Sequence, residues 1–406
     1  MRRRLAGFAL SSLTGAVCSA LAPIVAVLVL GPVQYGLFSI PYLMYAFGVS
    51  LQYSVVSEAW ARLRARGQGS VSWAAYSSPL SMLAGIVGVA AGILSFLVAG
   101  QPVSAVLMFA AVPFAVYQSG ARYYRVATGS LRRVLGSDVA GIAGFGIGIV
   151  ALHWLPGLAW IAGSWVLCAL SAVVVLGLPR FAWGSGLIGW IREHHAIIRR
   201  LLLDSLLMDA GAIGTPFLLA GLMGARQFGI YRAVANVAMP VRLLAEPLRP
   251  LLGRLPPRRL FSARVSALIV AAGVLLSAAC YLVLILVIPR LPFHLGTLVA
   301  LLPYALPTSL FVAGNMYITV YYYYCRTNAA HRRILAGRFA QTILVVALPI
   351  AGFAFAGLLG AIWGFAISSL IAAAVWVVVA RLGPDGTGAT HDADLESELN
   401  PLTDQL

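Results

Sequence analysis

Long apolar segments dominate this chain and constrain its fold more than any other feature. A helix needs about 20 predominantly apolar residues to cross a bilayer, and reading the 406 residues with that length predicts twelve spans. The predicted spans are residues 5–30, 37–60, 71–99, 103–124, 138–156, 158–178, 200–222, 229–250, 265–288, 297–324, 338–355 and 357–380. Backbone groups in lipid must be bonded within the protein, so we expect an all-α polytopic membrane protein.

Composition excludes an ordinary soluble domain. The chain is 61% hydrophobic and 10% charged, whereas soluble domains are roughly 45–50% apolar and 25% charged. A net charge of +16 would suggest nucleic-acid binding in a soluble protein. In a membrane protein the same charge marks cytoplasmic loops, so we expect no nucleic-acid partner.

The basic residues predict the orientation. All 28 are arginine, and every one except Arg226, Arg232 and Arg290 falls on a single side when the N-terminus is placed in the cytoplasm. The excess of Lys and Arg in cytoplasmic loops sets membrane topology. We therefore expect both termini to be cytoplasmic, with residues 5–30 retained as a first helix rather than cleaved as a signal peptide.

A short turn occurs twice. Gly31-Pro-Val-Gln-Tyr-Gly36 returns as Gly224-Ala-Arg-Gln-Phe-Gly229, 193 residues later, and Pro23 and Pro216 precede the two copies by eight residues. Each copy lies between the first and second helix of a six-helix half. Two halves in the same orientation predict two six-helix bundles related by a pseudo-twofold axis along the membrane normal.

These features carry a family resemblance. The basic N-terminus, the first helix containing Pro23 and the Leu-Gly-Pro-x-x-Tyr-Gly-Leu-Phe stretch at 30–38 resemble prokaryotic polysaccharide-export flippases, as does Phe228-Gly-Ile-Tyr-Arg-Ala233. These flippases belong to the multidrug/oligosaccharidyl-lipid/polysaccharide exporter superfamily. The resemblance covers the twelve-helix body, rests on loose motifs and implies movement of a lipid-linked oligosaccharide by alternating access.

The expected organisation has four parts. Residues 1–178 form an N-terminal six-helix lobe and 200–381 a C-terminal one. Between them, 179–199 is a cytoplasmic linker with an interfacial amphipathic helix. Residues 382–406 hold half of the acidic residues and are expected to be a disordered cytoplasmic tail.

Charged residues inside the second half are the first site candidates. Asp209 and Arg242 lie at similar depths on neighbouring helices, Asp204 lies shallower, and Arg232 is one helical turn from Asn236. Ionisable groups within the membrane usually face a cavity or a partner. One interpretation is an ion-pair cluster that ties two helices together. The other is functional: Arg232, Asn236 and Arg242 bind pyrophosphate, while Asp209 and Asp204 bind H⁺ or Na⁺.

The first half offers neutral and basic candidates. Gln52, Arg122 and Arg125 are predicted cavity residues, although positive-inside anchoring also explains the two arginines. Ser11 and Ala16 occupy the positions equivalent to Asp204 and Asp209, so we expect the coupling carboxylates in the second half only. Pro23 and Pro216 are the candidate hinges for a rocking motion.

We find no catalytic or metal signature. Cys18, Cys168, Cys280 and Cys325 are widely scattered and form no recognised spacing. We therefore expect neither an enzyme nor a resident metal or cofactor.

The functional hypothesis is a flippase in the bacterial cytoplasmic membrane. It would move an undecaprenyl-pyrophosphate-linked oligosaccharide to the outer leaflet for cell-surface polysaccharide biosynthesis. Its expected partners are the lipid-linked glycan, the bilayer, and a glycan polymerase and glycosyltransferases of the same pathway. The alternative is a cation-coupled drug or metabolite antiporter of the same fold.

Overall fold

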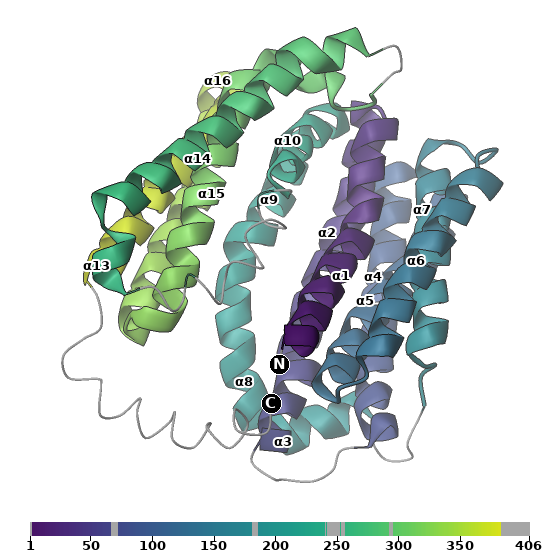
Figure 1. The fold of residues 1–406 in the computed structure, drawn as a ribbon. Helices are drawn as coiled ribbons and strands as arrows, with labels where there is room; N and C mark the ends of the chain where they lie inside the picture. The colour runs from purple at the N-terminus through teal and green to yellow at the C-terminus, as the bar shows by residue number, and fades with distance from the viewer. Residues whose placement is uncertain are drawn as a thin grey trace. The chain divides into compact units, whose positions relative to one another are not determined.

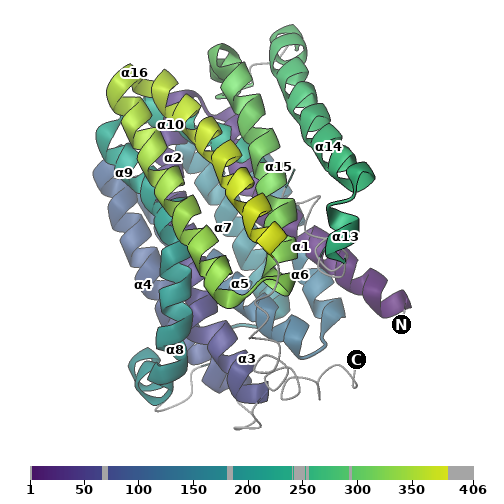
Figure 2. The same cartoon turned by 90° about the vertical axis from the view of Figure 1, so that its left-hand side faces the viewer.

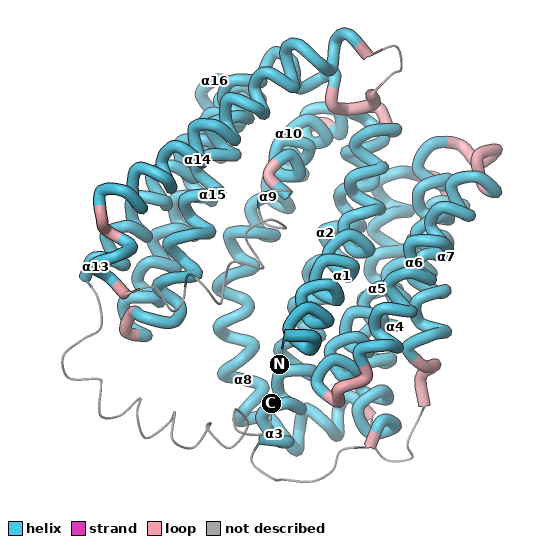
Figure 3. Tube along the Cα trace, in the orientation of Figure 1, coloured by secondary structure: helices cyan, strands magenta, loops and turns pink. Residues whose placement is uncertain are grey.

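The fold was analysed in a computed structural model that describes residues 2–65, 72–180, 186–239, 241, 252, 256–291 and 295–382. Helices form nearly all of this part of the chain, and no strand occurs among the described residues (Figures 1 and 3). The prediction of an all-α protein is confirmed.

Packing divides the chain into two compact units. The first comprises Met1–Asp209, Pro216–Arg232 and Leu295–Thr297, and the second comprises Ala210–Thr215, Ala233–His294 and Leu298–Leu406. The predicted lobes 1–178 and 200–381 follow the sequence repeat rather than packing, and they stay a prediction.

The first unit contains most of the N-terminal helices. They are α1 (Arg2–Val29), α2 (Pro32–Gln52), the π-helix η1 (Tyr53–Ser57), α3 (Glu58–Ala65), α4 (Trp73–Ala99), α5 (Pro102–Ala127), α6 (Leu131–Ala151), α7 (Gly157–Leu176) and α8 (Leu187–Asp209). Helix α6 packs on α7, α4 on α5, and α1 on α6. This arrangement gathers α1, α5, α6 and α7 around one interior.

Local sequence explains where these helices begin and end. Pro32 and Pro102 occupy the first helical position, where the missing N–H costs nothing. The Ser72 hydroxyl accepts the Ala75 N–H at the start of α4. Gly100 ends α4 in the left-handed conformation with φ 63°, which glycine adopts without a Cβ clash.

The remaining elements follow Asp209. They are the π-helix η2 (Ala210–Gly214), α9 (Thr215–Leu222), α10 (Ala225–Val237), α13 (Pro257–Leu260), α14 (Ala263–Leu282), η4 (Val283–Val287), η5 (Ile288–Arg290), η6 (Val299–Tyr304), α15 (Ala305–Asn328) and α16 (His331–Leu382). In the second unit α15 packs beside α16 (Figure 2). Helix α16 is a hairpin of two helices that turns at Ala356 and Gly357, where Gly357 has φ 58°. This turn lies at the predicted boundary between the last two spans.

The helices account for the predicted spans. Nine described helices are long and apolar enough to cross a membrane. One of the nine is the α16 hairpin, which contains two spans. Helix α2 and the described part of α10 supply the others, so the predicted twelve are all represented.

Two predicted boundaries differ from the structure. The span predicted at 138–156 begins at Leu131, because the exposed Arg132 and Arg133 form the first turn of α6 rather than a loop. The linker helix predicted within 179–199 starts at Leu187 and meets the next span at a kink at His194, so that span has no free start near residue 200. The interfacial position of this helix stays a prediction.

The two copies of the repeated turn lie against each other within the first unit. A Cβ on Gly36 would overlap the carbonyl oxygen of Ala225, and a Cβ on Gly229 would overlap that of Pro32. Pro32 and Ala225 are themselves 193 residues apart, like Gly36 and Gly229. The contact is therefore symmetric under the repeat, as a pseudo-twofold axis between α2 and α10 requires.

Candidate functional site

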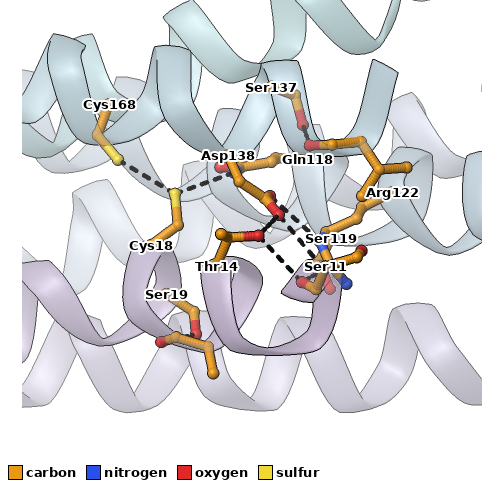
Figure 4. Close-up of polar contacts among 12 residues, drawn as sticks. Ser11, Thr14, Cys18, Ser19, Gln118, Ser119, Arg122, Ser137, Asp138 and Cys168 are labelled. Atoms are coloured by element: carbon orange, nitrogen blue, oxygen red, sulfur yellow. Dashed lines mark hydrogen bonds and ion pairs between the residues drawn. The ribbon is translucent and has the colours of Figure 1, made fainter. Parts of the chain in front are cut away.

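A buried ion pair lies inside the first unit, between α5 and α6. Asp138 is fully buried, and its Oδ1 is 3.2 Å from Nε of Arg122, whose side chain is 25% exposed. Nη2 of Arg122 lies 3.4 Å from Asp138 Oδ2, so both carboxylate oxygens face the guanidinium (Figure 4). A buried charge is tolerated when it is paired and hydrogen-bonded, and both conditions are met.

Helix α1 completes the surroundings of this pair. Thr14 donates to Asp138 Oδ2 at 2.7 Å, and Arg122 donates to the carbonyl and the hydroxyl of Ser11, the latter at 3.1 Å. A Cβ on Gly15 would overlap the guanidinium, so glycine makes room for Arg122 against α1. We call Ser11, Thr14, Arg122 and Asp138 the N-terminal polar cluster.

Sequence reasoning missed Asp138, a wholly buried carboxylate in the first half, while the expectation that the coupling carboxylates lie in the second half only stays a prediction. The error came from the helix boundary: a span starting at 138 places Asp138 at the interface, whereas α6 begins two turns earlier. The sequence did contain one signal for this pair: Asp138 follows Arg122 by 16 residues, on the next helix of a hairpin.

The second predicted first-half arginine, Arg125, is used in packing. Its Nε donates to the Leu176 carbonyl at 2.9 Å, and its Cζ lies 4.5 Å from the Trp73 ring centroid. These contacts hold the ends of α5, α7 and α4 together. The geometry favours the anchoring interpretation for Arg125.

Gln52 belongs to a buried hydrogen-bond chain at the π-helix η1. Gln52 Nε2 donates to Ser57, the Ser57 hydroxyl lies 2.6 Å from the Tyr76 hydroxyl, and Tyr76 donates to the Gly120 carbonyl at 2.7 Å. The chain is fully buried, and Gln52 Oε1 has no partner. The Gln52 side chain therefore lies in the interior between α2, α4 and α5 rather than on an open surface.

Asp209 lies at the end of α8 and faces α2. Its carboxylate interacts with the Ser50 side chain, and one turn away Ser205 lies 2.5 Å from Ser54. Farther along, Trp190 donates to the Val55 carbonyl at 2.7 Å. Oδ2 of Asp209 is buried without a partner, and the π-helix η2 starts at the next residue. Such π-bulges occur frequently at functional sites.

Arg232 is the most buried of the predicted arginines that the structure describes. Only 8% of the residue is exposed, and its Nε has no hydrogen-bond partner. The guanidinium is close enough to Tyr42 and Tyr231 to interact with both electrostatically. No carboxylate in the described part of the chain forms an ion pair with it.

The other predicted site residues are placed as follows. Asn236 lies on α10 one turn after Arg232 and is half-buried. Asp204 lies on α8, but its side chain is outside the description, as is the whole of Arg242. The expected pairing of Asp209 with Arg242 stays a prediction.

The two candidate hinge prolines differ. Helix α1 runs from Arg2 to Val29 as one helix through Pro23. Pro216 is the second residue of α9, just after the π-helix η2, which departs from α-helical geometry. The hinge role of both prolines stays a prediction. Among the described residues no group of three or more His, Cys, Asp or Glu side chains could hold a metal ion.

The fold matches that of solved transporters. No protein-family profile matches the chain, and no curated protein matches its sequence. An inward-facing multidrug resistance MATE family transporter of the MOP superfamily aligns at a TM-score of 0.61 and 14% identity, over 92% of this chain and 94% of that one. An outward-facing structure of such a transporter gives 0.55 and 15%, over 92% and 95%. A MATE protein in complex with MaL6 gives 0.57 and 14%, over 93% and 94%.

These likenesses assign the architecture. The chain has the helical membrane fold of these transporters and is similar to them over nearly its whole length. MOP is the superfamily to which the flippase resemblance also pointed. At this identity the similarity concerns the fold, and substrate and coupling have to be argued from the residues.

Proposed function

We propose that this chain is a flippase that moves an undecaprenyl-pyrophosphate-linked oligosaccharide from the cytoplasmic to the outer leaflet by alternating access. Its role would be cell-surface polysaccharide biosynthesis in a bacterial cytoplasmic membrane. The fold supports membrane transport, because solved proteins that share it are transporters described in inward- and outward-facing conformations. The anionic substrate class rests on the arginines.

The observation that carries the substrate class is Arg232. Arg232 is 8% exposed, its Nε has no partner, and it forms no ion pair with a carboxylate of the described residues. Such a buried charge carries a cost in a membrane protein unless a ligand compensates it. Arginine binds phosphate oxygens through bidentate, charge-assisted hydrogen bonds. A pyrophosphate linkage supplies that partner, whereas a cationic drug would be repelled.

Replacing Arg232 tests this assignment. We expect Arg232→Gln to reduce translocation of a polyprenyl-pyrophosphate glycan by about 10- to 100-fold, because hydrogen bonds to charged groups contribute roughly 1.5–3 kcal/mol. The measurement is initial flux in proteoliposomes at equal protein content. Arg226→Gln is the matched control, since Arg226 lies on the same helix but is exposed. Equal losses in both variants would refute a specific role for Arg232.

The same residues suggest how the cycle could be driven. Asp209 has a buried, unpartnered Oδ2 and interacts with the Ser50 side chain, and it is our candidate for H⁺ or Na⁺ binding. Asp138 is a second candidate, because a proton arriving there would release Arg122 from its ion pair. Both carboxylates lie in the first unit.

Neutralising Asp209 should uncouple transport from the ion gradient. We expect Asp209→Asn to lower gradient-driven flux by about 5- to 150-fold, the range given by a coupling free energy of about 1–3 kcal/mol. Exchange without a gradient should persist. The assay compares flux with and without an imposed H⁺ or Na⁺ gradient, and Glu193→Gln, at an exposed carboxylate, is the control. Gradient-driven flux equal to that of the unmodified protein would exclude Asp209 as the coupling site.

The second candidate function is a cation-coupled drug or metabolite antiporter. The buried carboxylate of Asp138 and the half-buried Asp209 favour it, and a solved structure with this fold is described as a multidrug resistance transporter. Arg232 argues against it, because it is buried and forms no ion pair with a described carboxylate. In either case we propose a transporter rather than an enzyme, with both termini in the cytoplasm. A glycan polymerase and glycosyltransferases remain the proposed pathway partners of the flippase.

A further inference from the structure

Two cysteines that are far apart in sequence meet in the interior of the first unit. Cys18 on α1 and Cys168 on α7 are 150 residues apart, yet their Sγ atoms are 3.8 Å from each other (Figure 4). The residues are 6% and 3% exposed. Their side chains already point toward one another, so the pair exists without rearrangement of either helix.

The surroundings of the thiols are polar on one side and tightly packed on the other. Gln118 Nε2 lies 3.6 Å from Cys18 Sγ. A Cβ on Gly141 of α6 would lie 2.9 Å from the same sulfur, so glycine allows α1 to bring Cys18 against α6 and α7. Gln118 reaches the pair from α5, one turn from Arg122. Four helices thus converge on the two sulfurs.

The distance of 3.8 Å between the two Sγ atoms fits a metal cation bound by two thiolates. Thiolates bind Zn²⁺ and similar cations at about 2.3 Å in tetrahedral geometry, and two such bonds at the tetrahedral angle end ~3.8 Å apart. Thiolate ligands select soft and borderline metals over Mg²⁺ or Ca²⁺. The amide group of a glutamine can be turned by about 180° to exchange its oxygen and nitrogen positions. Gln118 can therefore present its oxygen to a bound ion.

We propose that Cys18 and Cys168 form a binding site for a thiophilic metal cation, with Gln118 as an orienting neighbour. Binding releases the two thiol protons and forms two metal–sulfur bonds that join α1 to α7, with exogenous ligands such as water filling the remaining positions. No oxidation is involved. The site concerns a ligand that is not the cargo.

Cadmium is a suitable probe, because its thiolate complexes have a characteristic charge-transfer absorption. We expect the purified full-length protein, kept reduced, to bind a single Cd²⁺ with that absorption. Cys18→Ser and Cys168→Ser should each abolish it, whereas Cys280→Ser and Cys325→Ser should retain it. Gln118→Ala should weaken binding roughly tenfold, at the low end of the 10- to 100-fold effects of residues that orient metal ligands.

Three results would overturn the proposal. The first is no cadmium–thiolate absorption in the unmodified protein. The second is an absorption that survives in both Cys18→Ser and Cys168→Ser. The third is loss of the two thiols to a disulfide under the reducing conditions of the titration. Because binding is measured without transport, the result is independent of whether the flippase assignment holds.

Discussion

Replacing Gly36 or Gly229 by alanine should destabilise the protein and impair transport. Each added Cβ would overlap a backbone carbonyl oxygen, that of Ala225 or that of Pro32. Backbone atoms on helices cannot yield as a flexible side chain would, so α2 and α10 must separate. Overpacking of this kind costs about 1–3 kcal/mol, which thermal unfolding of the purified protein would measure.

The repeat supplies matched controls for this experiment. Gly31 and Gly224 lie in the same two turns, and a Cβ on either would meet no atom within 4 Å. We expect Gly31→Ala and Gly224→Ala to change stability by no more than about 0.5 kcal/mol. The double variant Gly36→Ala/Gly229→Ala should cost less than the sum of the single changes, because one separation relieves both overlaps. Unchanged melting of Gly36→Ala would contradict the symmetric contact.

Removing Asp138 should have the second large effect. Asp138→Ala leaves Arg122 with the Ser11 contacts but without its carboxylate. Removing one partner of a buried ion pair costs about 3–5 kcal/mol of stability. Because the Arg122 side chain is 25% exposed, we expect a loss near the lower end of that range. At about 2–4 °C per kcal/mol, the melting temperature should fall by ~6–12 °C.

A double variant separates loss of the pair from loss of packing. Asp138→Ala/Arg122→Met removes both charges, and replacing a buried pair by apolar groups is far less costly than removing one partner. The double variant should therefore melt above Asp138→Ala alone. Glu193→Ala, at a side chain that is 75% exposed, should melt like the unmodified protein. Strictly additive losses would show that Asp138 and Arg122 do not interact.

The membrane-spanning pattern could be predicted because its physical signal is local. Apolar length marks each span, and Gly357 adopts the left-handed conformation that turns the last hairpin. The repeated turn was also visible, since both copies keep their glycines at the same spacing. That Gly36 and Gly229 lie against each other follows only from the tertiary structure.

The interior of the first unit could not be predicted, because its contacts join distant segments. Cys18 and Cys168 are 150 residues apart, and Thr14 bonds Asp138 across 124 residues. An error of seven residues in one helix boundary moved Asp138 from the interior to the interface. Apolar patterning defines a span without fixing which residues face its neighbours, and this limit hid the polar cluster.

Arg232, unlike Asp138, could be identified as a candidate from the sequence. Its position inside an apolar helix marked it in the sequence, and the structure leaves its guanidinium buried with an unpartnered Nε. That combination is the physical basis for proposing an anionic cargo, and it distinguishes the two candidate functions by the sign of the substrate's charge.

The most direct test is transport by the purified protein in proteoliposomes. A fluorescent polyprenyl-pyrophosphate oligosaccharide is incorporated in both leaflets, and a membrane-impermeant reagent that modifies the glycan reports which molecules have crossed. The flippase account predicts protein-dependent exchange of this lipid, its reduction in Arg232→Gln but not in Arg226→Gln, and no exchange-coupled flux of cationic drugs. Absence of lipid exchange, together with drug-driven H⁺ or Na⁺ flux, would contradict the account and establish the antiporter.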